Sequence, residues 1–370
     1  MFMKKKKILI VSASFYPLNS PRSFRTTELA QELSKQGHDV VLYIPFKGYD
    51  YTEFAEKKGI DIRDLGDLRF KSLKIKGKGI ELLIRRLLRR SIGLLFEFPN
   101  IEYMFKVASC LKLESGYDLL ISIAVPHPIH WGVASVRKKR NNVADVWVAD
   151  CGDPYMGDTT DSFRKPFYFK YLEKWFCKKA DKISVPFQGA VKAYYKEFHN
   201  KIEIIPQGFD LSYLGEISYS KTTDYPVFAY AGGFIPGKRD PYKLLDFLSE
   251  NYKDFKFIVY TSQASLLASY KEKLKEKLEI REYIPREELL QVLSKMDFLV
   301  NFDNNTTTQL PSKLIDYSIA DRPVLNITSN LNTNTIHEFM EGNYSGKMNL
   351  LGSENYDIRL VAKKFTELHK

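Results

Sequence analysis

Short apolar runs rich in β-branched residues alternate with amphipathic segments along nearly the whole chain, and this alternation constrains the fold more than any other feature. Strands that alternate with helices predict a parallel sheet covered on both faces. In the first half, helical patterns lie between six predicted strands, over residues 7–14, 39–45, 119–124, 146–149, 182–185 and 203–205.

The same pattern starts again near residue 226. Four strands are predicted there, over 227–231, 255–261, 298–301 and 323–327, with helices over 241–249, 265–277, 286–294 and 312–319. A chain of 370 residues is too long for one hydrophobic core of ordinary size. We therefore predict an α/β fold with two Rossmann-like domains, 1–207 and 226–357, joined by a linker at 208–225. The ligand would bind in the cleft across which the domains face each other.

Composition excludes several classes of protein. The 25 Phe and 23 Tyr are too many for a disordered chain, and three dispersed Cys predict neither a disulfide framework nor a paired-cysteine zinc site. No apolar run approaches the ~20 residues of a membrane span. The basic and apolar start imitates a signal peptide, but Tyr16-Pro17 interrupts it and no small-residue cleavage site follows. We expect a cytoplasmic, reduced protein.

The positive charge lies in the first half of the chain. Net charge is +11, yet residues 1–200 carry 35 Lys and Arg against 22 Asp and Glu, whereas residues 201–370 carry 21 against 23. This asymmetry predicts that the first half faces an anionic partner, which is a nucleic acid, a phosphorylated substrate or a membrane surface.

The segment from Ile80 to Leu95, IELLIRRLLRRSIGLL, is basic and amphipathic. At about 100° per residue, its four arginines fall within about 140° of arc, opposite most of the apolar residues. Such a helix can lie on an anionic bilayer. It equally fits a domain helix whose apolar face is in the core and whose arginines are in water. The sequence leaves both interpretations open.

Polar and basic residues follow the first predicted strand. Ser20 or Ser23 is placed to cap the next helix, and Arg22 and Arg25 lie in its first turn. Free helix amides together with arginine favour an anion. The alternative is a capped helix with two solvated arginines. The loop contains neither a GxGxxG sequence nor a Walker A sequence, so a dinucleotide fingerprint is absent.

Two more strand ends in the first half carry candidate site residues. His127, hemmed by prolines, follows the strand at 119–124 and is placed to donate to a substrate hydroxyl or to shuttle a proton, unless its role is structural. His130, one turn further on, is expected to pack or cap. Asp150 and Asp153 follow the strand at 146–149 and are candidates to hold sugar hydroxyls or to cap the following turn.

The second half carries a predicted diphosphate site. Gly232 and Gly233 end a strand, and small residues let a diphosphate approach the backbone. Lys238 and Arg239 follow and would neutralise it, although a plain turn has the same composition.

A second segment of the same half strengthens that prediction. Pro311, near the start of a helix, leaves the amides of Ser312 and Lys313 free for phosphate, and Lys313 adds charge. Asp316, one turn on, is placed to reach ribose hydroxyls. Paired with the glycine loop, these residues predict a nucleotide site.

Four segments together resemble GT-B glycosyltransferases, most of all the family-4 group that builds bacterial surface polysaccharides. They are FYPLNSPRSFRTTELAQELSKQGHDVVLY, IIPQGFD, YAGGFIPGKRDP and LPSKLIDYSIADRPVL. The resemblance covers nearly the whole chain. It implies that the second domain binds a nucleotide-diphosphate sugar, that the first binds a glycan or lipid-linked acceptor, and that a C-terminal helix at about 358–370 packs back onto the first domain.

The resemblance also assigns roles by position. Lys238 and Arg239 match the cations at the donor phosphate, Asp316 matches the carboxylate that holds the ribose, and His127 matches a histidine near the transferred sugar. Asp150 and Asp153 fall in the segment that faces the acceptor. Thr308 departs from the pattern, because it stands where the family has a first carboxylate eight residues before Asp316. A neutral side chain does not stabilise positive charge on the sugar ring as a carboxylate does.

The prediction is a hexosyl-transferring enzyme of surface polysaccharide synthesis, retaining in type, without a cofactor or metal ion. Fixed cations and helix amides would stabilise the charge that grows on the departing nucleotide diphosphate. It would act in the cytoplasm or on the inner face of the membrane. An epimerase of the same fold and a non-catalytic nucleotide-sugar-binding protein remain as alternatives. Nucleic acid is not expected as a partner, since no recognised motif accompanies the positive charge.

Overall fold

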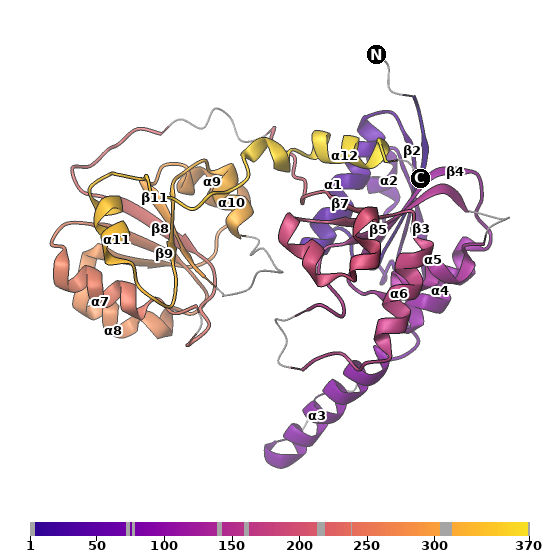
Figure 1. Ribbon diagram of the computed structural model, residues 1–370, viewed down its shortest axis with the longest axis horizontal. Coiled ribbons are helices and arrows are strands. Elements are labelled where there is room, and N and C mark those ends of the chain that lie inside the picture. Colours follow the sequence, from indigo (N-terminus) through magenta and orange to yellow (C-terminus); the bar gives the residue numbers. More distant parts are fainter. Residues whose placement is uncertain are drawn as a thin grey trace. The chain divides into compact units, whose positions relative to one another are not determined.

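Two sheets, each with all its strands parallel, form the framework of the chain in a computed structural model (Figure 1). The structure describes residues 4–71, 75, 78–138, 143–158, 163–212, 219–237, 239–303 and 313–368. The chain divides into unit 1, Met1–Phe209 with Asp357–Lys370, and unit 2, Asp210–Tyr356. The predicted α/β class with two Rossmann-like domains is confirmed.

The sheet of unit 1 has the order β3-β2-β1-β4-β5-β6-β7. The order reverses its direction between β1 and β4, and ligands of such sheets bind outside the carboxyl ends of the strands at that point. The strands are β1 Lys7–Ser12, β2 Asp39–Ile44, β3 Ile60–Asp64, β4 Tyr117–Ala124, β5 Ala144–Cys151, β6 Lys182–Val185 and β7 Ile202–Ile204. The α-helices are α1 Pro21–Lys35, α2 Thr52–Lys58, α3 Gly79–Phe96, α4 Glu102–Leu111, α5 Pro128–Val136, α6 Phe169–Lys179 and α12 Ile358–Thr366.

Strand β1 shows why the central strands are continuously apolar. Its residues alternate between the two faces of the sheet, and both faces are buried. Leu9 and Val11 belong to one core cluster with Trp131 and Trp147. On the opposite face, Ile8 and Ile10 belong to a second cluster, which includes Leu29, Leu33, Val361 and Phe365.

The sheet of unit 2 has the order β10-β9-β8-β11-β12, again with a reversal beside its first strand. Stacked rings of Phe228, Phe257 and Phe298 lie at its centre, with centroids 4.5 and 4.8 Å from Phe228. The strands are β8 Val227–Ala231, β9 Lys256–Tyr260, β10 Leu278–Arg281, β11 Phe298–Phe302 and β12 Val324–Ile327. The α-helices are α7 Tyr242–Asn251, α8 Ala268–Leu274, α9 Arg286–Leu293, α10 Lys313–Ile319 and α11 Thr333–Met340.

The C-terminal helix α12 is part of unit 1 and packs beside α1 (Figure 1). Ile358, Val361 and Phe365 are buried in the core cluster that also covers β1. The amide of Ile358 donates to the carbonyl of Phe209 (3.0 Å). The chain passes Ile358 closely at Gly208, where a Cβ atom would lie 2.6 Å from Cδ1 of that side chain.

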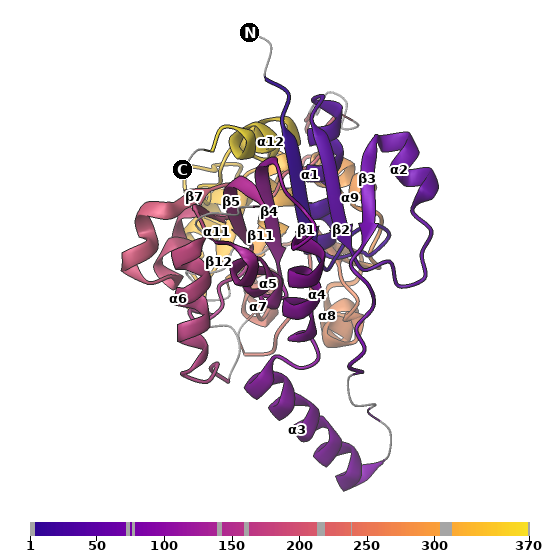
Figure 2. The same ribbon diagram turned by 90° about the vertical axis from the view of Figure 1, so that its right-hand side faces the viewer.

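Helix α3 is the element of unit 1 that is least integrated into the core. None of its residues is buried, and in both views it extends away from the sheet of unit 1 (Figures 1 and 2). The interpretation that its apolar face lies in a domain core is therefore wrong. Among the residues that the structure describes, no helix has the length and apolar character needed to span a bilayer.

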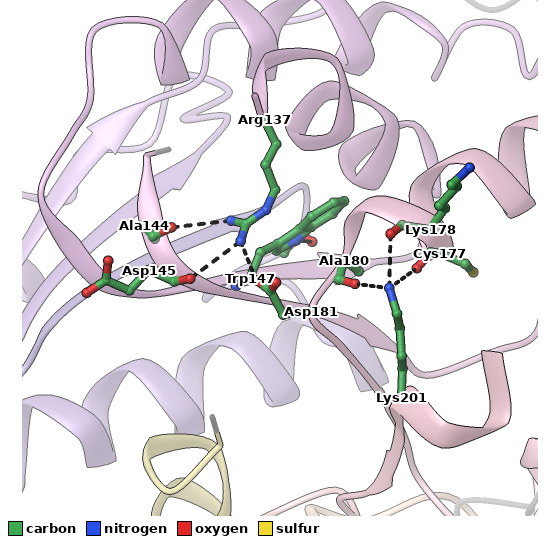
Figure 3. A network of polar contacts seen from close by, with 10 residues as sticks. Arg137, Ala144, Asp145, Trp147, Cys177, Lys178, Ala180, Asp181 and Lys201 are labelled. Carbon is green, nitrogen blue, oxygen red and sulfur yellow. Dashed lines mark hydrogen bonds and ion pairs between the residues drawn. The ribbon is translucent and has the colours of Figure 1, made fainter. Parts of the chain in front are cut away.

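A polar network joins the segments that precede β5, β6 and β7 in unit 1 (Figure 3). Arg137 pairs with Asp181 and donates to the carbonyl of Ala144 (3.3 Å), while Asp181 accepts from the amide of Trp147 (2.8 Å). The ammonium of Lys201 donates to carbonyls at the end of α6: Cys177 (3.2 Å), Lys178 (2.9 Å) and Ala180 (2.7 Å). A cation at this position satisfies carbonyls that the helix leaves open.

A second polar group is buried deeper and joins more segments. Arg25 on α1, which is 2% exposed, donates through Nε and Nη2 to both carboxylate oxygens of Asp150 at the end of β5 (3.0 and 2.9 Å). Its Nη1 donates to the carbonyl of Pro206 (2.5 Å), and its guanidinium lies over the ring of Phe365 on α12. Ser184 on β6 donates to Asp150 (2.6 Å). Burial raises the pKa of Asp150, but Arg25, Arg22 and the bond from Ser184 together outweigh burial, and the net pKa is lowered.

We expect Asp150→Asn to lower the free energy of unfolding by about 3 kcal/mol or more, because it leaves the Arg25 guanidinium buried without its counter-charge. Urea unfolding measures this loss. The matched control is Asp39→Asn, since Asp39 pairs with Lys5 and both side chains are more than half exposed. Its loss is expected to stay below about 1 kcal/mol. Equal losses in the two variants would contradict the role of the buried pair.

Candidate active site

The candidate site of unit 1 lies in the loops after β1, β4 and β5, at the carboxyl ends of the strands. Ser20 accepts a hydrogen bond from the amide of Ser23 (3.2 Å) and caps α1. The predicted cap is therefore confirmed. This bond accounts for Ser20 without a ligand.

Two residues assigned to the acceptor require a correction. Arg25 and Asp150 are both buried, and each is used in bonds within the protein. They fix α1 against β5 and leave no exposed face to an acceptor. The alternative of a solvated Arg25 is wrong as well, because this side chain faces the core.

Arg22 differs from Arg25, although the two are one helical turn apart. Its guanidinium lies directly on Gly152, where a Cβ atom would be 1.6 Å from Nη1. Its Nε is buried and has no hydrogen-bond partner. The charge of Arg22 lowers the pKa of both His127 and Asp150, so the cation lies near both residues. Arg22 is placed to donate to a ligand at the carboxyl ends of β4 and β5.

His127 immediately precedes α5 and is almost completely buried. Burial holds its pKa well below the usual range, and the nearby charges of His130, Lys165 and Arg22 act in the same direction. A hydrogen bond to the backbone of Asp153 opposes them. The imidazole is therefore neutral near pH 7. Its Nε2 has no hydrogen-bond partner in the protein, so it is available for one hydrogen bond with a ligand hydroxyl.

Three residues beside His127 were missed by sequence reasoning. The ring of Tyr155 lies 4.5 Å from the His127 ring, and its hydroxyl donates to Glu97 (3.0 Å). Lys165 pairs with Glu97 and lies 4.8 Å from the Tyr155 ring. Glu97 directly follows α3, so the end of this helix is bonded to the surroundings of His127. No local pattern links residues so far apart in sequence.

His130 has the packing role that was expected. Trp147 Nε1 donates to the hydroxyl of Ser122 (2.8 Å), which leaves the Ser122 proton for His130 Nδ1 (2.8 Å). The other ring nitrogen lies 3.4 Å from Cys151 Sγ. Burial lowers the pKa of His130 to about 3, so it stays neutral.

A buried carboxyl group lies next to the loop that carries Asp153. Glu173 on α6 is 0% exposed. Its Oε1 accepts from the amide of Met156 (3.3 Å), while its Oε2 has no hydrogen-bond partner. Burial raises the pKa of Glu173 to about 7, although the bond from Met156 opposes the shift.

The candidate site of unit 2 begins where β8 ends. Gly232 has a φ of 148°, and a Cβ atom there would lie 3.0 Å from the hydroxyl oxygen of Tyr230, so the turn requires glycine. The carbonyl of Gly233 accepts from Tyr230 (2.7 Å) and from Arg239 Nη1 (3.2 Å). Arg239 and Ile235 exchange backbone hydrogen bonds of 2.8 and 3.0 Å, which closes the loop.

Lys313, the first described residue of α10, brings a second cation to this loop. Its Nζ is buried, has no hydrogen-bond partner and lies 4.4 Å from the centre of the Tyr230 ring. Burial and the charge of Arg239 together lower the pKa of Lys313 to about 6, although the charge of Asp303 acts in the opposite direction. The structure thus brings the glycine loop, Arg239 and Lys313 together.

Asp316 is placed one turn further along α10 and is held by a residue that the sequence did not suggest. Arg286, the first residue of α9, donates through Nε to Asp316 Oδ1 (2.7 Å) and pairs with it through Nη2. Burial raises the pKa of Asp316, against the effect of Arg286. Four residues named from the sequence lie outside the described residues: Lys238, Thr308, Pro311 and Ser312.

Among the described residues, neither candidate site gathers metal ligands. In the part of the chain that the structure describes, no group of three or more His, Cys, Asp or Glu is placed to hold a metal ion. The polar atoms without partners near the two sites are mainly nitrogen atoms, namely Arg22 Nε, His127 Nε2 and Lys313 Nζ. This set suits anionic and hydroxyl groups better than a cation.

Two parallel-sheet units of this kind match the GT-B fold of glycosyltransferases. The sequence profile of Glycosyltransferase Family 4 matches residues 24–213, which is more than half of the chain. The chain therefore belongs to Glycosyltransferase Family 4.

Solved structures agree with this fold over nearly the full chain. A glycosyltransferase from Rickettsia africae is 13% identical with a TM-score of 0.60, covering 99% of this chain and 98% of its own. Anabaena HepE in complex with UDP is 10% identical with a TM-score of 0.59, covering 98% of each chain. The lipopolysaccharide outer core galactosyltransferase WaaB is 12% identical with a TM-score of 0.57, covering 97% and 98%. No curated protein matches the chain in sequence.

Glu173 generates a prediction for the pH dependence of stability. Its pKa is higher in the folded chain, at about 7, than in the unfolded chain, so folding weakens as pH rises from about 4.5 through 7. Between these pH values the wild-type chain loses free energy of unfolding, and Glu173→Gln is expected to reduce that loss by about 3 kcal/mol. Thermal unfolding at pH 5 and pH 8 tests it, with the surface variant Glu197→Gln as control. An unchanged pH dependence in Glu173→Gln would overturn the assignment.

Proposed function

We propose that this chain transfers a hexosyl group from a nucleotide-diphosphate sugar to a glycan or lipid-linked acceptor in the synthesis of a cell-surface polysaccharide. The transfer needs no metal ion and retains the anomeric configuration. Membership of Glycosyltransferase Family 4 supports a transferase. Anabaena HepE, which has the same fold, has been solved with UDP-glucose, and this supports a nucleotide sugar as the donor.

The buried amino group of Lys313 is the observation that carries this proposal. Its nitrogen has no hydrogen-bond partner in the empty protein, and the cation Arg239 lies close enough to lower its pKa. A diphosphate at the Gly232 loop would compensate the charge of Arg239 and the charge that Lys313 gains when it takes up a proton. In the reaction, negative charge grows on the departing nucleotide diphosphate, and cations fixed beforehand stabilise that charge without reorganisation.

The residues of unit 1 are proposed to handle the sugar and the acceptor. His127 is neutral, so it positions a hydroxyl through Nε2 rather than neutralising a charge. Arg22 supplies a cation beside it. Asp153 contributes its backbone, which holds the His127 ring in place.

An epimerase of the same fold would need carboxylates that act as acid and base. A UDP-N-acetylglucosamine 2-epimerase shares the fold at 12% identity with a TM-score of 0.50. In this chain, however, Asp150 is locked by Arg25 and Asp316 is held by Arg286. We therefore favour the transferase.

We also propose a cytoplasmic location with peripheral attachment to the inner face of the membrane. Helix α3 supports it, because its apolar side chains are exposed and its arginines are basic at any cellular pH.

Nucleotide binding is expected to depend on Lys313 and to take up a proton. At pH 8 the free lysine is neutral, because its pKa is about 6, and a bound diphosphate would raise that pKa. A thermal-shift screen against UDP, GDP and CMP identifies the nucleotide. Calorimetry of the nucleoside diphosphate at pH 8 in two buffers of different ionisation enthalpy then measures the uptake, which is expected to approach one proton.

Lys313→Met is expected to abolish this uptake and to weaken binding by about 10- to 100-fold, since a charge-assisted bond contributes about 1.5–3 kcal/mol. Lys253→Met, at an exposed lysine of the same unit, is the matched control and should bind as the unmodified chain does. Full affinity and full proton uptake in Lys313→Met would exclude the proposed diphosphate site.

His127→Ala is expected to separate transfer from donor binding. Loss of one fixed hydrogen bond lowers the turnover by about 10²-fold or more, whereas nucleotide binding in unit 2 stays unchanged. Incorporation of labelled sugar into a membrane extract, from the donor that the screen identifies, measures turnover. NMR of the product reports the anomeric configuration. Unchanged turnover in His127→Ala would remove His127 from the mechanism.

A further inference from the structure

Helix α3 presents an apolar face that nothing in unit 1 covers. Ile80 is 77% exposed, and Leu83, Ile84, Leu87 and Leu88 are each about half exposed. Such an area of exposed apolar side chains on one helix marks an interaction surface. Both views show the helix extending away from the sheet of unit 1 (Figures 1 and 2).

A basic groove runs along another side of the same helix. It has a volume of about 680 Å³. Its wall on α3 is formed by Arg86, Arg89 and Arg90, and its opposite wall by the turn at Phe98 and Pro99. The ring of Phe98 stacks on Phe70 (5.5 Å), which supports that wall. Arg85 does not line the groove and instead pairs with Glu81 (2.6 Å).

Exposed aromatic side chains continue the apolar surface from α3 to α6. Phe96 ends α3, and Phe167 and Tyr171 lie at the start of α6, all more than half exposed. The hydroxyl of Tyr168 donates to the carbonyl of Leu95, which ties the two helices together. Arg90 lies over the exposed ring of Phe163 (4.7 Å). Arginine beside aromatic and aliphatic side chains is the composition of a membrane-interface surface.

We infer that α3 docks on an anionic phospholipid bilayer, with its leucine face in the acyl region and lipid phosphate in the groove of Arg86, Arg89 and Arg90. This inference rests on the proposed peripheral attachment and names the lipid chemistry that the attachment recognises. Charge complementarity selects the occupant, because guanidinium groups bind phosphate in bidentate fashion. A second copy of the chain on the leucine face would leave the arginine groove without an anion.

The docked helix ends at the site of unit 1. Glu97, the residue after α3, accepts from Tyr155 and pairs with Lys165, and the Tyr155 ring lies against His127. A bilayer bound to α3 would therefore be linked to His127 through Glu97 and Tyr155. An acceptor that is itself anchored in the lipid would reach this site without leaving the membrane.

Vesicle flotation of the full chain tests the inference. The vesicles contain phosphatidylcholine alone or mixed with phosphatidylglycerol. We expect binding to the mixed vesicles, reduced by salt, and weak binding to phosphatidylcholine alone. Arg86→Gln combined with Arg89→Gln should weaken binding to the mixed vesicles by about tenfold or more, at about 1 kcal/mol for each basic residue. Arg85→Gln is the matched control and should lose less, because this arginine does not line the groove.

Leu83→Ser combined with Leu87→Ser should abolish binding to both kinds of vesicle. All these side chains are exposed, and thermal unfolding is expected to show that each variant folds. Equal binding to both vesicles, or equal losses in the groove variant and Arg85→Gln, would overturn the phosphate groove while leaving peripheral attachment in place. No binding to any vesicle would overturn both. The nucleotide-dependent thermal shift reports donor binding independently, since it depends on unit 2 and not on α3.

Discussion

The buried bond between Arg25 and Asp150 sets the geometry of unit 1. It joins α1 to the end of β5, and through Ser184, Pro206 and Phe365 it reaches β6, the segment after β7 and the C-terminal helix. Because Asp150 is fixed, Gly152 two residues later is fixed as well, and Arg22 rests on it. An interaction that no ligand touches thus decides where the free guanidinium of the site lies. Buried ion pairs contribute specificity of this kind more readily than net stability.

Sequence periodicity contained the information that separates the two arginines. Arg25 precedes Leu29 by four residues and Leu33 by eight, and both leucines are buried, so the three side chains share the buried face of α1. The presence of a charge at the first of these positions led to an expectation of ligand contact instead. Asp150 likewise is the second-to-last residue of β5, a strand whose last five residues are all buried. A charge on an apolar stripe indicates a buried partner before it indicates a ligand.

The central strands were predictable, as were the edge strands β7 and β12, whereas the edge strands β3 and β10 were not. Each sheet keeps its apolar runs in the middle, where both faces are covered, as in β1 and β8. β3 reads IDIRD and β10 reads LEIR, and each has one buried residue, so neither shows a continuous run. The predicted helix at 265–277 is shorter in the structure, where 3-10 turns precede and follow α8. In unit 2, Lys313 was predictable from its place after a strand, whereas the Arg286–Asp316 bond depends on packing between α9 and α10, which no local pattern encodes.

The two kinds of cation in this chain suit two kinds of anion. The lysine in unit 2 is buried, and its pKa of about 6 lets it stay neutral until a diphosphate arrives, which avoids an uncompensated charge in the empty site. A group that gains its proton with the ligand can also lose it again when the ligand leaves. The arginines of α3 are exposed and keep their charge at every cellular pH. A permanent charge suits an anionic bilayer surface, whose charge does not change during the reaction, and a titratable one suits a nucleotide that must bind and depart in every cycle.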